Sequence, residues 1–240
     1  MKGVILAGGT GSRLHPLTQI TNKHLLPIYD RPMISYGIEA LVKGGITDIM
    51  LVTGGTHAGE FLRLLGNGQE YSIERLFSAY QEKPGGIAEA LALAERFVGD
   101  DRVVVMLADN VVEFSIRPSV KRFEEQAEGA RILLSRVQDP SHLRHLGVPE
   151  LDSAGRVTKI VEKPEHPPSP FAVSGIYFYP PGVFEVIPTL QPSGRGELEI
   201  TDVNNHYVGK GAMEYDTLEG FWGDAGESID AYYAVNDFVR

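Results

Sequence analysis

The chain has 240 residues and, with 22 Lys and Arg against 32 Asp and Glu, a formal net charge of −10. Its 42% hydrophobic and 22% charged residues are typical of a folded protein, and the acidic balance argues against nucleic-acid or anionic-membrane partners, which require a Lys/Arg surface. The absence of cysteine excludes disulfides, thiolate nucleophiles and Cys-ligated metal centres. No apolar segment has the length of a signal peptide or a membrane span, so we expect a cytoplasmic protein.

Short apolar runs alternate with amphipathic segments through the first half of the chain. Buried strands are predicted for the unbroken apolar runs at 4–7, 48–53 and 103–107. Helices are predicted for the segments with helical spacing at 32–43, 57–65 and 86–98. Unbroken strands separated by helices indicate an α/β fold with a Rossmann-like, mostly parallel sheet flanked by helices. Ligands of such sheets bind beyond the carboxyl ends of the strands, which places residues 8–13 and 109–110 at one edge.

The second half of the chain has more strand-like segments. Residues 148–162 predict a hairpin around the turn at 152–155, and residues 172–179 predict another strand. Helices are predicted at 199–208 and 228–239. Because there is no repeat and no linker, we predict a single domain, 1–240, in which residues 141–240 form a β-rich elaboration laid against the sheet of residues 1–140.

A glycine-rich loop with the sequence LAGGTGSRL follows the first predicted strand, at 6–14. Glycines at such a place let backbone N–H groups approach an anion closely. The dinucleotide-binding pattern G-x-G-x-x-G is incomplete because Leu14 stands at its third glycine, and the Walker pattern fails because Gly9 replaces its lysine. What remains is a glycine loop that ends in Arg13, whose permanently charged fork suits a polyphosphate.

Two other charged residues are candidates for the same site, although each has an ordinary structural explanation. Lys23 follows soon after the glycine loop, but a lone lysine is most often a solvated surface charge. Asp109 directly follows a buried strand, but an aspartate there often forms a turn. If the loop binds phosphates, Lys23 lies within reach of the same ligand and Asp109 stands where a metal ligand is needed.

Seven segments, taken together, resemble the sugar-nucleotide pyrophosphorylases, and among these the glucose-1-phosphate thymidylyltransferases. They are LAGGTGSRL (6–14), NKHLLPIYDRPM (22–33), LADN (107–110), VEKP (161–164), AVSGIYFY (172–179), RGELEITDVN (195–204) and WGDAG (222–226). The resemblance covers nearly the whole chain in order. It implies a nucleotide-diphospho-sugar transferase fold, with a nucleotide-binding half at 1–140 and a sugar-binding half at 141–240.

The resemblance also implies a reaction in which glucose 1-phosphate attacks the α-phosphorus of dTTP, giving dTDP-glucose and pyrophosphate with Mg²⁺ as cofactor. The nucleophile is a phosphate monoester with a second pKa near 6, so it is already an anion and needs no general base. Positioning and cations should therefore carry the catalysis, and we expect a locally positive pocket in this acidic molecule.

The residues of the implied site fall into four groups. The catalytic group is Arg13, Lys23, Lys163 and Asp109, with Arg13 at the β- and γ-phosphates, Lys23 at the α-phosphate and Lys163 at the sugar phosphate. The metal ligands are Asp109 and Asp224. The nucleotide would contact Leu6, Ala7, Gly8, Gly9, Thr10, Gly11, Ser12, Arg13, Lys23, Gln81, Pro84, Gly86 and Asp109. The sugar would contact Asn110, Gly147, Glu162, Lys163, Val173 and Trp222.

The Gln81 amide has the donor and the acceptor that a thymine or uracil edge requires. Residues 195–199 are expected to shape the site rather than to react. The chain departs from the usual family residues at His24, Glu89, Ala108, Leu146 and Gly223, and these departures bear on sugar choice more than on reaction type. It also stops at Arg240, where the family's helices for subunit contacts and a regulatory site would follow, so we expect weak or absent feedback by a downstream dTDP-sugar. A homo-oligomer built through other surfaces stays open.

Three alternatives remain open. UTP could replace dTTP, or both could be used, because a methyl group in a pocket is worth only about 1–3 kcal/mol. A non-enzymatic nucleotide-sugar sensor subunit is disfavoured because Arg13, Lys23 and Asp109 are all present. A nicotinamide-dependent oxidoreductase is disfavoured by Leu14.

Overall fold

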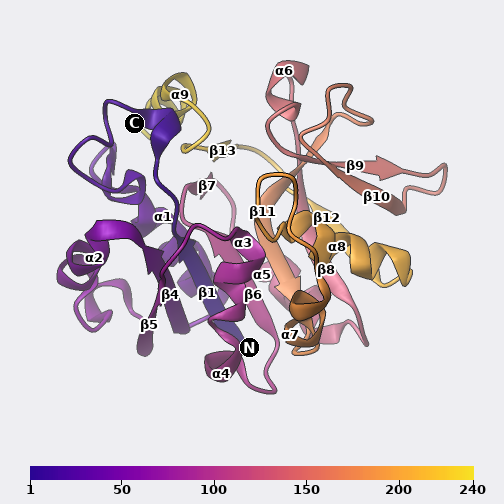
Figure 1. Cartoon of the computed structure of the whole chain (residues 1–240), viewed down its shortest axis with the longest axis horizontal. Coiled ribbons are helices and arrows are strands. Elements are labelled where there is room, and N and C mark those ends of the chain that lie inside the picture. The colour runs from indigo at the N-terminus through magenta and orange to yellow at the C-terminus, as the bar shows by residue number, and fades with distance from the viewer.

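A seven-stranded sheet forms the centre of the computed structural model, which describes all residues 1–240 (Figure 1). The strand order is β12-β8-β11-β6-β1-β4-β5. All neighbours pair parallel except β11, which is antiparallel to both β6 and β8. The predicted mostly parallel sheet is therefore confirmed. Its strands are β1 (Lys2–Ala7), β4 (Asp48–Gly54), β5 (Arg75–Gln81), β6 (Val103–Leu107), β8 (Ala130–Arg136), β11 (Phe171–Tyr179) and β12 (Met213–Thr217). The expectation that residues 141–240 are laid against the sheet is wrong in part, because β11 and β12 of that half are strands of the sheet itself and β11 lies between β8 and β6.

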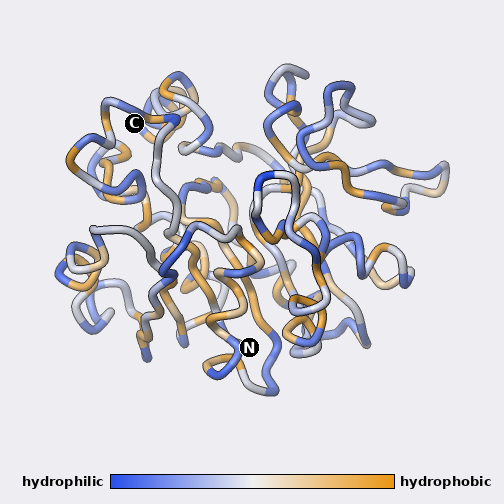
Figure 2. The backbone as a smooth tube through the Cα atoms, viewed as in Figure 1, coloured by the Kyte–Doolittle hydropathy of each residue, from blue (hydrophilic) through white to orange (hydrophobic).

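Helices cover both faces of the sheet because its strands are apolar on both sides. Val4 and Leu6 of β1 pack in one core cluster and Ile5 and Ala7 in another. Figure 2 shows the resulting hydrophobic colour along the central strands. The first cluster includes residues of α3 (Ile87–Ala92), α4 (Glu95–Val98), α7 (Val183–Val186) and α8 (Ile200–Gly209). The second includes residues of α1 (Met33–Gly44), α2 (Ala58–Leu65) and α5 (Arg117–Glu125). No helix is both long and apolar enough to span a membrane.

The helix predicted over 86–98 is wrong in its continuity, since the segment forms two short helices, α3 and α4. The backbone N–H of the fully buried Ala94 bonds to the carbonyl of Leu91, three residues back, at 2.9 Å. This tighter turn interrupts the i to i−4 ladder of an α-helix. Strands β5, β8 and β12 and helix α5 were not predicted.

Smaller elements gather at the edge of the sheet that lies uppermost in Figure 1. The predicted hairpin is confirmed as β9 (Gly147–Leu151) paired antiparallel with β10 (Val157–Glu162). β7 (Asn110–Val112) pairs antiparallel with β13 (Trp222–Asp224). The remaining short elements, which do not all lie at this edge, are β2 (Pro27–Ile28), β3 (Arg31–Pro32), α6 (Pro140–Leu143), the terminal helix α9 (Ile229–Val239), and the 3₁₀ turns at Ser12–Leu14, Lys23–Leu25, Gly55–His57, Gln69–Tyr71 and Ile187–Thr189.

The register of β1 and β6 brings the candidate residues to the same edge. Leu6 of β1 stands opposite Leu107 of β6, and the N–H of Ala108 donates to the carbonyl of Leu6 at 3.0 Å. The glycine loop and Asp109 therefore leave neighbouring strands side by side, as the parallel arrangement predicted.

Candidate active site

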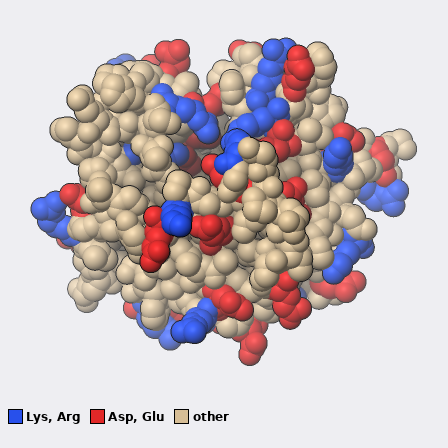
Figure 3. All heavy atoms as spheres, viewed as in Figure 1, with Lys and Arg blue, Asp and Glu red and all other residues tan.

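A cavity of about 300 Å³ opens at this edge between the sheet and the elements contributed by the second half. Figure 3 shows acidic and basic side chains gathered around a hollow on this face of the molecule. Sixteen predicted site residues line the cavity: Leu6, Gly8, Gly9, Arg13, Lys23, Gln81, Pro84, Gly86, Asp109, Asn110, Gly147, Glu162, Lys163, Val173, Trp222 and Asp224. The structure therefore brings both halves of the predicted site together around one space.

Four residues of the predicted nucleotide site do not line this cavity. Ala7 is fully buried in the core cluster on the opposite face of the sheet. Thr10 and Ser12 are exposed, and Gly11 lies between them with a φ of 64°. Their contact with a nucleotide stays a prediction, and for Ala7 the buried side chain leaves only the backbone available.

An ion pair between Lys23 and Asp109 forms the inner wall of the cavity. The Lys23 ammonium bonds directly to Asp109 Oδ2. Burial favours the neutral form of each group, but their mutual attraction outweighs it. The attraction between the two groups, together with the negative charge of Asp224, raises the pKa of Lys23. The same attraction holds the pKa of Asp109 well below its usual range. Both groups are therefore charged across the physiological pH range.

Gly226, in the WGDAG segment, leaves space for this pair. A Cβ at Gly226 would lie 2.8 Å from Lys23 Nζ and closer still to Asp109 Oδ2. The backbone of the same segment is bonded to the end of β6, since the N–H of Ala225 donates to the Asp109 carbonyl at 2.9 Å. The close approach of the two segments thus requires a residue without a side chain at 226.

Asp224 brings a second carboxylate beside Asp109. It stands opposite Asn110 in the β7–β13 pairing, and its Oδ1 accepts a hydrogen bond from the Gly226 N–H at 2.8 Å. Burial and the charge of Asp109 raise the pKa of Asp224 to about 7, so its anionic form is disfavoured without further positive charge. No group of three or more His, Cys, Asp or Glu side chains could hold a metal ion. Two carboxylates nevertheless fit Mg²⁺, which often uses only one or two protein carboxylates together with substrate phosphates.

His24 is a cavity residue that the sequence marked only as a departure from the family. It is 2% exposed, its Nδ1 lies 2.9 Å from Asn22 Oδ1, and its Nε2 lies 3.9 Å from Asp109 Oδ2. Burial lowers the pKa of His24, so the imidazole is neutral at pH 7. It supports the Lys23–Asp109 pair without adding charge.

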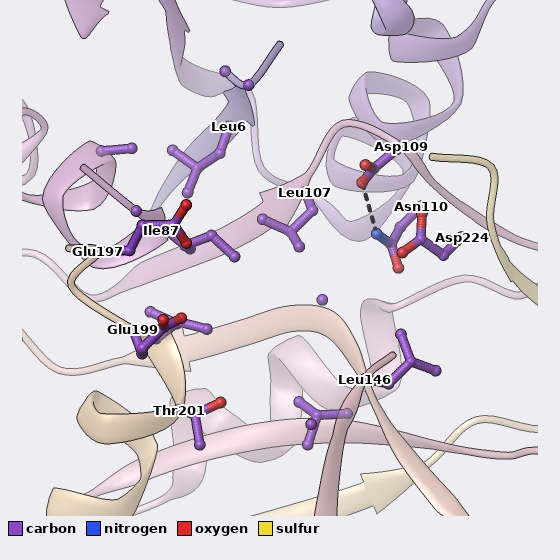
Figure 4. Close-up of a pocket in the computed structure, with 18 of the residues that line it drawn as sticks. Leu6, Ile87, Leu107, Asp109, Asn110, Leu146, Glu197, Glu199, Thr201 and Asp224 are labelled. Atoms are coloured by element: carbon purple, nitrogen blue, oxygen red, sulfur yellow. Dashed lines mark hydrogen bonds between the residues drawn. The ribbon is translucent and has the colours of Figure 1, made fainter. Parts of the chain in front are cut away.

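A hydrogen-bonded chain links Trp222 to Asp109 in the part of the cavity predicted to bind the sugar. Trp222 Nε1 donates to Asn110 Oδ1 at 2.6 Å, and Asn110 Nδ2 donates to Asp109 Oδ1 at 3.1 Å. Figure 4 shows Asp109, Asn110 and Asp224 together on one side of the cavity, with Glu199 and Thr201 across from them. Asn110, predicted as a sugar ligand, is thus also a structural link between the indole and the carboxylate pair.

Glu162 lies in a charged network on the opposite wall. Its Oε2 accepts from Thr201 Oγ1 at 2.6 Å, and its Oε1 lies 3.3 Å from Lys163 Nζ and 3.7 Å from Arg195 Nη2. Arg195 also pairs with Glu199 at 2.9 Å. Arg195, Glu197 and Glu199 thus line the cavity, and that they shape the site without reacting stays a prediction. Thr201 of α8 belongs to the RGELEITDVN segment but was not predicted as a site residue.

The cavity is not positively charged, so the expected positive pocket is wrong. Four Lys and Arg residues and five Asp and Glu residues line it, and the rest are uncharged or histidine. The cations are Arg13, Lys23, Lys163 and Arg195, and the carboxylates are Asp109, Glu162, Glu197, Glu199 and Asp224. Arg13 is exposed and makes no ion pair, whereas the other three cations already face carboxylates.

Comparison with known proteins identifies the family of the chain. A family model described as "Nucleotidyl transferase" matches residues 2–240. The chain belongs to this family. It is 46% identical over 243 residues to the glucose-1-phosphate thymidylyltransferase of an Actinoplanes species, a match that covers 100% of this chain and 78% of that relative. The family resemblance seen in the motifs is thereby confirmed, and the chain is a nucleotidyltransferase.

Solved structures support the fold. A protein from Bacillus anthracis, assigned as a glucose-1-phosphate thymidylyltransferase and crystallised with a sucrose, has a TM-score of 0.93 at 48% identity, with 100% of this chain and 95% of that chain covered. A UDP-glucose pyrophosphorylase complexed with UDP-glucose has a TM-score of 0.85 at 23% identity, with 99% and 97% covered. The second similarity shows a common fold only.

Proposed function

We propose that this nucleotidyltransferase uses dTTP and glucose 1-phosphate to make dTDP-glucose and pyrophosphate, with Mg²⁺ as cofactor. The proposal rests on one observation, that five charged residues line the same cavity. They are Lys23, Asp109 and Asp224, together with Arg13 from the glycine loop and Lys163 from the second half. Similarity to the Actinoplanes thymidylyltransferase over the whole chain supports this choice of substrates.

The reaction needs little from the protein beyond placement and charge. A phosphate oxygen of glucose 1-phosphate forms a bond to the α-phosphorus of dTTP, and the bond from that phosphorus to the β-phosphate oxygen breaks as pyrophosphate leaves. Arg13, which has no partner in the chain, holds the departing phosphates. Lys23 steadies the α-phosphate, and Lys163 steers the sugar phosphate from the opposite wall. Such positioned cations stabilise charge where it develops.

The charge balance of the cavity supports a divalent cation. Four positive and five negative side chains line the walls, so they alone do not offset the charge of two phosphorylated substrates. Asp109 and Asp224 would hold Mg²⁺, whose charge would favour both the anionic form of Asp224 and the binding of phosphate.

A pyrophosphate-release assay over a matrix of nucleoside triphosphates and sugar 1-phosphates, with Mg²⁺ or with EDTA, tests this function. We expect release with dTTP and glucose 1-phosphate in Mg²⁺, a product with the mass of dTDP-glucose, and none in EDTA. The reactions with UTP in place of dTTP decide whether the enzyme uses UTP instead of dTTP, or both. Failure to release pyrophosphate with any pair would refute the proposal.

Arg13→Ala tests the role of the glycine loop. We expect it to lower kcat/KM by about 100-fold or more, as the loss of a group that stabilises transition-state charge commonly does. The matched control is Arg63→Ala, which removes an exposed arginine from α2, and it should keep the wild-type rate. A wild-type rate for Arg13→Ala would disprove its assigned role.

A further inference from the structure

The side-chain amide of Gln81 has a fixed orientation at the end of β5. Gln81 is 8% exposed, and its Nε2 donates to the Gly86 carbonyl at 3.2 Å and to Glu89 Oε1 at 3.1 Å. An amide nitrogen has two N–H groups, so both are satisfied by acceptors of the chain. Turning the amide over would place its oxygen against a carbonyl and a carboxylate, which is unfavourable.

The remaining atom of the amide, Oε1, is directed toward Gly8 of the glycine loop. A Cβ at Gly8 would lie only 3.1 Å from Gln81 Oε1, and both residues line the cavity. Gln81 therefore presents an acceptor, and no donor, to a ligand, so the expectation that its amide supplies both to the base edge is wrong. Gly86 also lines the cavity, and its backbone N–H donates to no group within the chain.

Of the two acceptors that bind the Gln81 amide nitrogen, the second is the Glu89 carboxylate, which lies behind the cavity wall. It belongs to the first turn of α3 and is half-buried. Its carboxylate lies against Gly85, where an added Cβ would overlap it, and it does not line the cavity itself. It can thus affect a ligand only through Gln81 and the adjacent loop.

We propose that Glu89 is a positioning residue that holds the Gln81 amide with its acceptor oxygen toward the nucleobase. This inference rests on the proposed function and adds how the base is selected. An acceptor at Gln81 beside a donor at the Gly86 N–H complements the N3–H and O4 of thymine or uracil. Cytosine has the same size and the reverse pattern, an acceptor at N3 and a donor at N4. Glu89 therefore helps the site select against cytosine.

The test compares dTTP with dCTP in three variants and the wild type. Glu89→Met removes the acceptor at similar length, Glu89→Ala removes it without filling its place, and Glu89→Gln retains an acceptor oxygen. Glu95→Met is the control, since Glu95 is an exposed glutamate of the neighbouring helix α4. The measurements are kcat/KM for each triphosphate, dissociation constants of dTMP and dCMP by calorimetry, and melting temperature.

We expect the ratio of kcat/KM for dTTP over dCTP to fall about tenfold in Glu89→Met and Glu89→Ala, with Gly86 retaining part of the selection. Glu89→Gln and Glu95→Met should stay within about twofold of wild type. The ratio of dissociation constants should change in parallel. Unchanged ratios in both acceptor-free variants, or a loss in Glu89→Gln equal to theirs, would overturn the proposal. A wild type that binds dTMP over dCMP but makes no dTDP-glucose would instead refute the proposed function alone.

Discussion

Substitution of Gly226 by alanine tests whether the Lys23–Asp109 pair is the centre of the site. Gly226 is buried and its φ is not in the left-handed region, so alanine is compatible with the backbone and the effect is steric. The added Cβ would lie 2.8 Å from Lys23 Nζ and closer still to Asp109 Oδ2. Real Cβ atoms do not approach heavy atoms this closely, so one member of the pair has to move.

The displacement should cost more in activity than in stability. Overpacking of a buried site costs typically about 1–3 kcal/mol, which a folded domain of this size tolerates. Misplacement of a reacting group by about 1 Å can lower the rate about 100-fold. We therefore expect Gly226→Ala to be folded at 25 °C, with kcat/KM reduced by about 100-fold or more.

Pyrophosphate release gives kcat/KM, and urea denaturation gives the free energy of unfolding. The matched control is Gly59→Ala in α2, where no heavy atom lies within 4 Å of the added Cβ. It should leave activity unchanged and stabilise the helix by about 0.5–1 kcal/mol. Wild-type kcat/KM in Gly226→Ala would refute the reasoning, because the pair could then move without consequence.

Three other substitutions have different expected effects. Asp224→Asn should abolish turnover yet, without Mg²⁺, raise the free energy of unfolding by more than about 1 kcal/mol, measured by urea denaturation. Because the native pKa of about 7 exceeds the unfolded value, this gain should grow from about pH 4 to pH 7 and then level off. Trp222→Phe, which leaves Asn110 Oδ1 without its donor, should lower kcat/KM about tenfold and stability by about 1 kcal/mol in the same assays. Thr201→Val, which frees Glu162, should raise KM for glucose 1-phosphate in steady-state kinetics and leave KM for dTTP unchanged.

Strands β1, β4 and β6 were predictable because they are apolar on both faces and end next to glycines or Asp109. Strand β5, in the same half, was missed because most of its residues are exposed or half-buried. Parallel pairing of β1 with β6 brings the carboxyl ends of both strands to one edge, so the glycine loop and Asp109 could be paired from the sequence. The break at Ala94 was not predictable, because a continuous helical pattern does not reveal a single tighter turn. Strand β12 was missed because it lies at the edge of the sheet and none of its residues is buried.

The contacts among the predicted sugar-binding residues depend on tertiary structure and could not be predicted from local patterns. Trp222 and Asn110 are 112 positions apart, and Thr201 and Glu162 are 39 apart. The charge of the cavity was predicted to be positive, whereas it is nearly balanced, for the same reason. The motifs drew attention to cations that phosphate needs, but the fold also brings carboxylates such as Glu199 to the same walls.

Because the charges of the cavity nearly balance, the Lys23–Asp109 pair has two roles in our proposal, one in stability and one in ligand binding. In the structure each group neutralises the other, and without a partner either charge would be costly at this depth. Our proposal assigns a different partner to each during turnover, the α-phosphate to Lys23 and Mg²⁺ to Asp109. The two charges that stabilise each other in this pair are thus the same two that the site would offer to its ligands. Arg13, which has no partner to give up, would make the first contact with the triphosphate.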